Sequence, residues 1–146
     1  MSSSCVFCEI AHHREPASIV FEDDLTMAFV GLRQFHAGHT LVIPRRHLHD
    51  VRELDPVTGA ALMATLSRIT RAVGCAFPSQ GLSLWSSIGE AAFQEVPHLH
   101  IHVHPRKFDD DFLRVYPNDP ALPGRDVLDG YALLIREHLD PPEPKI

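Results

Sequence analysis

The feature that most constrains this chain is the segment from residue 98 to residue 104, in which four histidines alternate with three aliphatic residues. A repeat of two is the period of a β-strand, whose successive side chains point to opposite faces. The aliphatic residues would bury one face against a core, and the imidazoles would share the other face and line a groove or pocket. We therefore expect a strand over residues 97–104, with a core face of Leu99, Ile101 and Val103 and a working face of His98, His100, His102 and His104.

Neutral imidazole acts as a nucleophile, a proton shuttle or a metal ligand near neutral pH. A row of histidines therefore fits a metal site, a phosphate-handling site or a pH switch. Side chains two residues apart on one face of a strand are separated by about 6–7 Å. Three successive histidines of a straight strand do not close easily around one small ion at this spacing. The row by itself thus favours phosphoryl chemistry.

The rest of the chain predicts an α+β fold. Residues 56–77 carry apolar side chains at helical spacing, and Asp55 can cap this helix with Pro56 at its first position. A C-terminal helix is expected over residues 126–139, after an Asp- and Pro-rich loop over residues 107–124. Further strands are expected over residues 19–22, 25–30, 39–43 and 82–88, which together with 97–104 make a five-stranded antiparallel sheet with the long helix on one face.

Length and composition exclude several classes of protein. A chain of 146 residues can bury a substantial core, so we expect residues 1–146 to form a single domain. No apolar run approaches the length of about 18 residues that a membrane span needs, and the N-terminus lacks the pattern of a secretion signal. The formal net charge of −6 does not suit a protein that binds duplex nucleic acid. We expect a cytoplasmic protein that contacts neither duplex nucleic acid nor a membrane.

Two of the three cysteines are arranged as Cys5-x-x-Cys8, which argues against an extracellular disulfide framework. The pair can be half of a zinc site, two free thiols or a redox centre. A thioredoxin-like redox motif opens a long helix inside a βαβ unit, whereas only a short segment separates this pair from Pro16. A zinc site needs two further ligands from elsewhere in the chain.

Residues 89–106 resemble the signature of the histidine triad (HIT) family of nucleotide-binding hydrolases and transferases. In that signature a glutamine and three further residues precede three histidines that alternate with hydrophobic residues. The resemblance continues upstream through residues 5–10, 19–23, 28–29 and 38–47, with the N-terminal Cys pair of a bacterial Hint-like branch. It spans residues 5–106 almost without a break, while residues 107–146 match only loosely.

The resemblance implies a HIT-like fold and a reaction at the α-phosphorus of nucleoside phosphoramidates or dinucleoside polyphosphates, with a purine nucleotide or nucleotide conjugate as ligand. This reaction passes through a nucleotidyl-histidine intermediate and does not require a metal. The family also implies a homodimer that pairs through the long helix and the fourth strand. Trp85 lies in that predicted strand, where packing in the core and contact with a second subunit both remain open.

The resemblance also implies roles for individual residues. His100 would be the nucleophile, and its Nδ1 must donate to a backbone carbonyl near His98 so that Nε2 is unprotonated. His102 would donate to a phosphoryl oxygen, Gln94 would contact the phosphate, and His98 would orient His100 unless it binds zinc. A purine slot would be lined by Phe7, Ile10, Phe29 and Leu32, and a structural zinc would be held by Cys5, Cys8, His47 and His98.

A few positions depart from the family pattern. Gly31 stands where many members have an Asp that binds the ribose, Ser87 where many have Asn, and Glu95 where many have Ser or Thr. A carboxylate at position 95 repels a phosphate unless it turns away or pairs with a cation such as Arg106. His104 stands where an aliphatic residue is usual and is expected at the rim. The intact triad favours an enzyme, and the departures favour the alternative, a zinc-stabilised nucleotide-binding or interaction module with little turnover.

Overall fold

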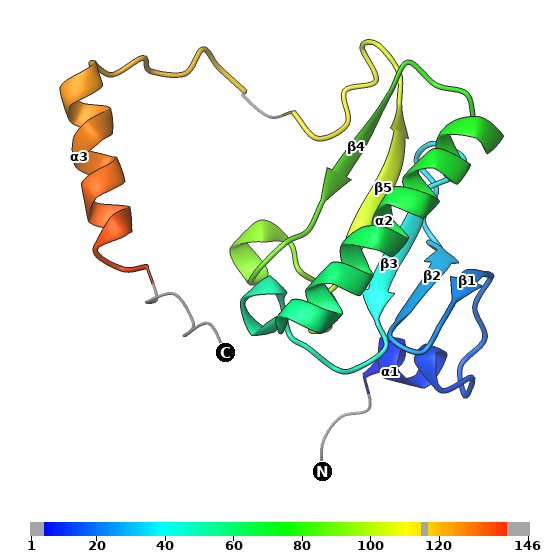
Figure 1. Ribbon diagram of the computed structural model, residues 1–146. Helices are drawn as coiled ribbons and strands as arrows, with labels where there is room; N and C mark the ends of the chain where they lie inside the picture. Colours follow the sequence, from blue (N-terminus) through cyan, green and yellow to red (C-terminus); the bar gives the residue numbers. More distant parts are fainter. Residues whose placement is uncertain (1–4, 115–116, 140–146) are drawn as a thin grey trace. The chain divides into compact units, whose positions relative to one another are not determined.

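The computed structural model describes residues 5–114 and 117–139. The chain divides between Asp110 and Asp111 into two compact units, which are described separately. The first unit is built from a β-sheet, two α-helices and two short 3-10 helices (Figure 1). In chain order these elements are α1 (Val6–Ala11), β1 (Ile19–Glu22), β2 (Thr26–Val30), β3 (Thr40–Pro44), η1 (Val51–Glu53), α2 (Pro56–Ala76), β4 (Gly81–Trp85), η2 (Glu90–Ala92) and β5 (Ile101–Arg106).

The five strands form one antiparallel sheet in the order β1-β2-β3-β5-β4. β5 lies between β3 and β4, so the strand that carries the last two histidines of the row is an inner strand. Thr40 of β3 is opposite Val103 of β5, and Trp85 of β4 is opposite His102. The predicted α+β class and the predicted five-stranded antiparallel sheet are confirmed.

α2 covers one face of the sheet (Figure 1). The helix begins where the sequence predicts, because the Asp55 carboxylate accepts a hydrogen bond of 3.0 Å from the backbone N–H of Thr58 and Pro56 lies in the first turn. Leu99 and Val103 are buried against the helix, as the period of the row predicts. The main core cluster joins Leu62, Leu66, Ile69 and Val73 of α2 to Ala28, Val42, Leu99 and Val103.

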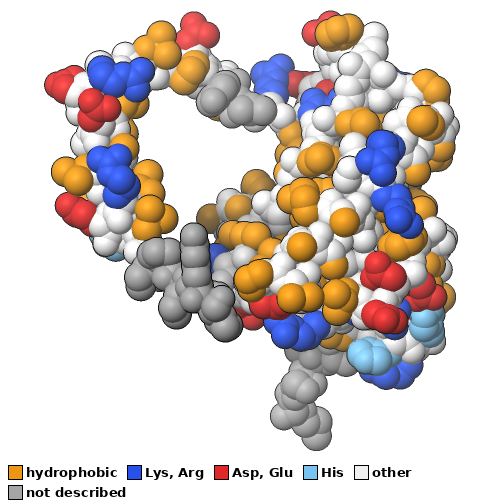
Figure 2. Space-filling view, viewed as in Figure 1, with side chains coloured by type: hydrophobic (Ala, Val, Ile, Leu, Met, Phe, Trp, Pro, Cys, Tyr) orange, Lys and Arg blue, Asp and Glu red, His pale blue; other side chains and the backbone are white. Residues whose placement is uncertain are grey.

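The outer surface of α2 and the neighbouring strand β4 remain apolar. Val57 and Met63 of α2 and Leu82 and Leu84 of β4 are all exposed. Figure 2 shows hydrophobic side chains gathered on the face that α2 and β4 form. β4 is also an edge strand of the sheet. An exposed sheet edge beside apolar surface is a common place for another chain to pair.

α1 packs against the opposite face of the sheet and was not expected from the sequence. Phe7 and Ile10 form a second core cluster with side chains of β2 and β3 that point away from α2. A helix of six residues is too short to show a periodic pattern. Its packing places Cys5 and Cys8 close to the histidine row. The strand residues in this cluster are Met27, Phe29, Leu41 and Ile43.

The fourth and fifth strands are shorter than predicted. β4 ends at Trp85 rather than at residue 88, and β5 begins at Ile101 rather than at residue 97. The pairing of β3 with β5 reaches only from Val103 to Ile101. Before that point the backbone N–H of Leu99 donates to the carbonyl of Leu48 at 2.7 Å. The first two histidines therefore precede the strand, and the four imidazoles do not form one straight row.

The second unit contains α3 (Arg125–Arg136), which ends before the predicted boundary at residue 139. Its apolar side chains are exposed rather than packed in a core. Within the described ranges, none of the helices is long and apolar enough to cross a membrane. That residues 1–146 form a single domain stays a prediction. The exposed apolar residues of α3 are Val127, Leu128, Tyr131, Leu133, Leu134 and Ile135.

Candidate active site and metal-binding cluster

The four histidines of residues 98–104 lie in four different surroundings. His98, His100 and His104 are buried, and His102 is half-buried. The four rings do not share one straight strand face as the row predicted, because His98 and His100 precede β5. Each ring instead contacts partners from a different part of the chain, and these partners decide what each imidazole can do.

His98 lies in a cluster with Cys5, Cys8 and His47. The Nδ1 atom of His98 is 3.4 Å from Sγ of Cys5 and 3.5 Å from Sγ of Cys8, and Nδ1 of His47 is 3.3 Å from Sγ of Cys8. Nε2 of His98 donates to the carbonyl of Pro44 at 2.8 Å, which leaves Nδ1 free to act as a ligand. All four ligand atoms lie within 4.8 Å of one another. We call these four residues the cysteine–histidine cluster.

The donors of this cluster fit a tetrahedral metal ion. Typical Zn–S and Zn–N bond lengths place neighbouring ligand atoms about 3.4–3.8 Å apart, which is close to the distances of 3.3–3.5 Å found here. Burial and the neighbouring Cys5 raise the pKa of the Cys8 thiol to about 11. A bound cation reverses this preference, because it stabilises the thiolate. The fold thus brings together the four residues predicted as metal ligands.

His100 is oriented by the backbone of His98. Its Nδ1 lies 2.7 Å from the carbonyl oxygen of His98, so Nδ1 donates and Nε2 of the neutral ring keeps a lone pair. Ser86 Oγ donates to the carbonyl of His100 at 2.8 Å, and the ring of Phe7 meets the imidazole edge-on. Burial lowers the pKa of His100, an effect opposed by its hydrogen bond to His98 and by the Glu95 carboxylate. The ring is therefore neutral and held in one orientation.

His102 forms a pair with His39, a residue that the sequence analysis did not single out. Nδ1 of His102 is 2.8 Å from Nε2 of His39, and Nδ1 of His39 is 3.1 Å from the carbonyl of Arg33. Because a carbonyl only accepts, Nδ1 of His39 carries a proton, and in the neutral pair its Nε2 accepts from His102. Trp85 stacks on His102, with ring centroids 4.3 Å apart and planes 6° apart. Trp85 thus belongs to the site, and we call His39 and His102 the imidazole pair.

The imidazole pair has room for one more proton. In the neutral pair Nε2 of His102 is bare, so this atom becomes a hydrogen-bond donor only when the pair is protonated. Burial and the neighbouring imidazoles lower the pKa of His102 to about 3, and burial also lowers the pKa of His39. An anion placed beside the pair acts in the opposite direction, because it stabilises the charged form. The pair is therefore suited to donate a proton or a hydrogen bond to a bound phosphate.

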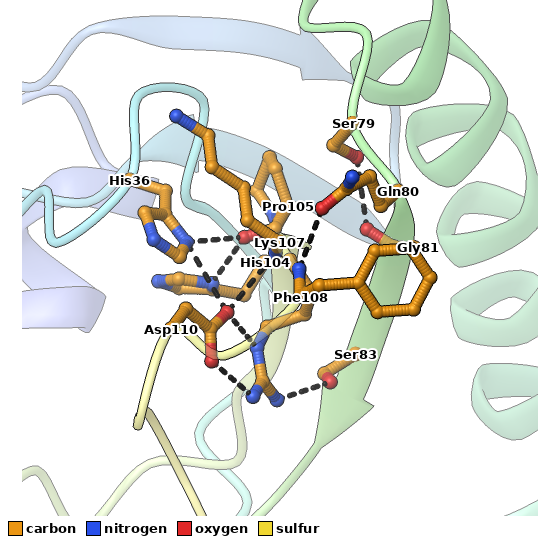
Figure 3. A network of polar contacts seen from close by, with 11 residues as sticks. His36, Ser79, Gln80, Gly81, Ser83, His104, Pro105, Lys107, Phe108 and Asp110 are labelled. Atoms are coloured by element: carbon orange, nitrogen blue, oxygen red, sulfur yellow. Dashed lines mark hydrogen bonds and ion pairs between the residues drawn. The ribbon is translucent and has the colours of Figure 1, made fainter.

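His104 takes part in a polar network toward the end of β5 (Figure 3). Its Nδ1 and that of His36 lie 2.8 and 2.7 Å from the carbonyl oxygen of Pro105. The Asp110 carboxylate accepts two hydrogen bonds from Arg106, each of 2.7 Å. His104 is fully buried in this network, so the expectation that it lies at the rim is wrong. The rings of His36, His39 and Trp85 lie 4.8–5.7 Å from that of His104, between centroids.

Glu95 pairs with a cation other than the one proposed from the sequence. The Nη1 atom of Arg33 lies 3.0 and 3.1 Å from the two carboxylate oxygens of Glu95. Arg106 is engaged by Asp110 instead, so the suggested pairing with Glu95 is wrong. The Arg33–Glu95 ion pair connects the segment that holds the imidazole pair with the loop that precedes the triad.

Gln94 organises that loop. Its Oε1 accepts from the backbone N–H of Gly89 at 3.0 Å, and its Nε2 donates to the carbonyl of His49 at 2.9 Å. Within the loop Gly89 and Phe93 have φ angles of 84° and 63°, in the left-handed region that glycine adopts most easily. The amide of Gln94 thus fixes the loop from inside. Its predicted contact with a phosphate stays a prediction.

The residues predicted to form the purine slot are only partly brought together. Phe7, Ile10 and Phe29 share the buried cluster between α1 and the sheet, whereas Leu32 is fully exposed. The ring of Phe7 lies 5.2 Å from that of His100, between centroids, and so forms an aromatic wall beside the triad. Contact of these side chains with a base stays a prediction.

Comparisons with known proteins agree with one another. Residues 12–109 match the family model of the HIT domain. Adenosine 5'-monophosphoramidase hnt1 of Schizosaccharomyces pombe is 30% identical over 121 residues, which are 82% of this chain and 88% of that protein. The crystal structure of a HIT family protein from Bacillus subtilis matches with a TM-score of 0.88 and 30% identity, over 96% of this chain and 100% of that chain. The crystal structure of a Zn-bound histidine triad family protein from Mycobacterium smegmatis matches with a TM-score of 0.68 and 38% identity, over 79% of this chain and 84% of that chain.

Proposed function

Because the chain belongs to the HIT domain family, we propose that it is a nucleotide hydrolase or transferase acting at the α-phosphorus of nucleoside phosphoramidates or dinucleoside polyphosphates. The product is AMP or another nucleoside monophosphate. A relative of similar length is named for the hydrolysis of adenosine 5'-monophosphoramidate, which supports the phosphoramidate part of this proposal.

The hydrogen bond between Nδ1 of His100 and the carbonyl of His98 carries the proposal. It fixes the tautomer in which Nε2 of His100 has a lone pair, as a nucleophile requires. Nε2 attacks the α-phosphorus, the bond to the leaving group breaks, and a nucleotidyl-histidine forms. Water then attacks the same phosphorus and releases the monophosphate, which restores the imidazole. His98 contributes to this step through its backbone, because its ring faces the cysteines.

The imidazole pair supplies the proton that the leaving group needs. When a phosphate lies beside His102, its negative charge raises the proton affinity of the pair. Nε2 of the protonated His102 then donates to a phosphoryl oxygen or to the departing atom, and His39 holds the ring in place through its own contact with Arg33. The nucleotide base lies beside the wall made by Phe7 and against the exposed side chain of Leu32.

We propose that the metal held by the cysteine–histidine cluster is zinc and that its role is structural. The two thiols and two imidazoles are ligands that zinc prefers, and the Zn-bound relative from Mycobacterium smegmatis supports the same identity. Bound zinc would neutralise two thiolates and tie α1 to the segment before β5. A reduced cysteine pair that binds zinc would suit the reducing cytoplasm, where we place the protein.

We further propose that the protein is a homodimer that pairs through α2 and β4. The exposed edge of β4 and the apolar side chains around it support this arrangement (Figure 2). A continuous sheet across two copies would satisfy the open edge of β4 and cover Leu82 and Leu84 at once. Light scattering at low micromolar concentration tests it, and a monomer mass would contradict it.

The function is tested by incubating the purified protein with adenosine 5'-phosphoramidate and, separately, with diadenosine tetraphosphate. We expect AMP to be released from at least one of them. Denaturation in SDS at alkaline pH within the first turnover should trap AMP on the protein through a bond that acid later cleaves, and peptide mapping should place it on His100. A His138→Ala variant, which loses an exposed histidine of the second unit, should behave as the wild type does.

Binding of AMP without release of AMP from either substrate would contradict the proposed enzyme. That outcome would favour the alternative, a zinc-stabilised nucleotide-binding module with little turnover. The two possibilities are therefore separated by turnover, and affinity alone does not distinguish them.

A further inference from the structure

The ion pair between Arg33 and Glu95 lies at an exposed rim of the candidate site. The Arg33 side chain is 85% exposed and that of Glu95 is 67% exposed, whereas His100 is buried. An ion pair in contact with this much water adds little to the stability of a fold. The pair is therefore not needed to hold the two loops together, and its charges are free to act on a ligand.

Both charges are connected to the triad. The carbonyl of Arg33 accepts from His39, which holds His102 in turn. Glu95 directly follows Gln94, the residue that fixes the loop before the triad. The Arg33–Glu95 ion pair thus joins the segment that orients His102 to the loop that leads into His98 and His100.

We propose that Glu95, positioned by Arg33, selects substrates whose leaving group carries no negative charge. This inference rests on the proposed function and narrows it. Because the fold buries His100, a substrate reaches it from the solvent side, and the leaving group of an in-line displacement points away from Nε2 toward that side. A carboxylate at the rim repels a sulfate, phosphate or polyphosphate there and does not repel an amine. The preferred substrates are therefore nucleoside phosphoramidates of uncharged or protonated amines.

The chemical step shows where the selection acts. The bond from Nε2 of His100 to phosphorus forms while the phosphorus–nitrogen bond breaks, and the electron pair of the broken bond stays on the leaving nitrogen. That nitrogen takes one proton from the imidazole pair and departs as an amine, which gains a further proton from water at neutral pH. An anhydride instead releases a sulfate or phosphate oxygen anion. Only this second kind of leaving group places additional negative charge beside Glu95.

Arg33 has the opposite effect on the selection. Its guanidinium lies within 3.1 Å of both oxygens of Glu95 and so offsets part of the negative charge. Removal of Arg33 would leave the carboxylate uncompensated and strengthen the preference for amines. Removal of the charge of Glu95 would leave the guanidinium uncompensated and weaken the preference for amines. The two members of the pair therefore shift the preference in opposite directions.

The experiment compares kcat/KM for adenosine 5'-phosphoramidate with kcat/KM for adenosine 5'-phosphosulfate and for diadenosine tetraphosphate. We expect Glu95→Gln to lower the ratio of amidate to anhydride about tenfold at low salt, mainly by improving the anhydrides. We expect Arg33→Ala to raise this ratio about threefold. Both shifts should shrink as the ionic strength rises from about 0.02 M to about 0.5 M, because salt screens exposed charges.

Two further variants serve as controls. Glu95→Asp keeps the charge and should keep the wild-type preference. Arg114→Ala removes an exposed arginine of the second unit that is paired with Asp111, and it should leave the ratio unchanged. Because both residues of the proposed pair are exposed, the melting temperatures should stay within about 2 °C of the wild type. An unchanged ratio in Glu95→Gln would overturn the inference while the enzyme itself stands. Failure of the wild type to release AMP from any of the three substrates would remove the proposed function and the inference together.

Discussion

Two contacts between histidines flank β3, one near each end of the strand. They differ in the other residues that take part in each contact. Before β3, His39 contacts His102 through a hydrogen bond of 2.8 Å. After β3, His47 lies against His98 with ring centroids 5.1 Å apart. The nitrogens of the imidazole pair face each other, whereas those of the cysteine–histidine cluster face two sulfur atoms. A pair of histidines is thus suited to hold a proton or a metal ion, depending on whether cysteine sulfur atoms lie beside it.

His98 takes part in the cysteine–histidine cluster and also in the orientation of His100, through different atoms. Its ring lies in the cysteine–histidine cluster, and its backbone carbonyl accepts the hydrogen bond from His100. The backbone carbonyl of His98 is available to His100 whether or not the ring of His98 binds a metal ion. We therefore expect loss of the metal to affect mainly stability, and changes around the imidazole pair to affect mainly catalysis.

The largest effect is expected from His100→Ala. Removal of the nucleophile eliminates the covalent route and should lower kcat by about 10³–10⁶-fold. The metal content should be unchanged, because the carbonyl and the ring of His98 remain in place. Steady-state kinetics and elemental analysis on the same preparation measure both quantities. Retention of more than about a tenth of wild-type activity would show that another residue is the nucleophile.

Cys8→Ser changes the other region. We expect about one zinc per chain in the wild type and little in the variant, with a loss of about 3 kcal/mol or more of unfolding free energy, since a metal bound only by the folded state stabilises it. For a chain of this size the melting temperature should fall by about 10 °C. At 25 °C kcat should remain within about threefold of the wild type. A wild-type protein prepared without chelators that contains no metal would favour two free thiols.

A matched pair of variants, His39→Ala and His47→Ala, tests the contrast directly. Each variant removes a histidine that lies outside residues 98–104 and contacts one of the four histidines within that segment. His39→Ala should lower kcat about 10- to 100-fold and leave the metal content unchanged, because His102 loses the partner that orients it. His47→Ala should lower the metal content and leave kcat nearly unchanged. Equal effects of the two variants on kcat would mean that the two regions act as one unit.

Acid should weaken the fold through the buried imidazoles that bind no metal. Burial, with the charges of neighbouring residues, lowers the pKa of His102 to about 3 and that of His104 to about 4, whereas both groups titrate near 6.5 in the unfolded chain. Their contribution to stability is therefore complete above about pH 6.5 and is lost as the pH falls toward the folded-state values. Urea denaturation between pH 7.5 and pH 4.5 should show a smaller loss of stability in His104→Gln than in the wild type. Parallel curves for the two proteins would exclude His104 as a source of the acid sensitivity.

The smallest effect is expected from Gly31→Asp. This variant adds a hydrogen-bond acceptor in the region of the imidazole pair and leaves the cysteine–histidine cluster unchanged. A Cβ atom at this position would lie 3.5 Å from the carbonyl of His39, an ordinary contact, so the fold tolerates a side chain. The new carboxylate should improve the preference for AMP over 2′,3′-dideoxy-AMP about tenfold, because a hydrogen bond from a ribose hydroxyl to a charged group is worth about 1.5–3 kcal/mol. Calorimetry on both proteins measures it, with Gly31→Ala as the steric control. A wild type that already prefers AMP a hundredfold would show that another residue binds the ribose.

The parts of the fold that follow from local sequence pattern were predicted well. Val103 is buried because alternation on a strand leaves one face for the core, and Leu99 joins the same core cluster although it precedes β5. The helix that begins after Asp55 was predicted from its cap and its period. The start of the last strand was not, because its pairing with β3 stops at Val42 although β3 continues to Pro44, and the row itself does not encode where pairing with a neighbouring strand stops.

The partners of the histidines could not be predicted from local pattern. His39 and His102 are 63 residues apart, and they meet only because β3 and β5 are neighbours in the sheet. His104 is surrounded by His36, His39 and Trp85, which come from separate parts of the chain and meet only in the folded sheet. The four ligands of the cysteine–histidine cluster were identified through the family resemblance, and the structure confirms that their donor atoms lie together.

The contact that orients His100 comes from a peptide oxygen, and every amino acid at position 98 has one. The imidazole of residue 98 is therefore required by the cysteines and not by the nucleophile. A lineage that lost Cys5 and Cys8 could replace His98 and keep an active enzyme, provided that the backbone kept its course. In evolutionary terms a metal site at the cysteine–histidine cluster would be a detachable part of this fold, and the first histidine of the motif would be free to vary once the two cysteines were lost.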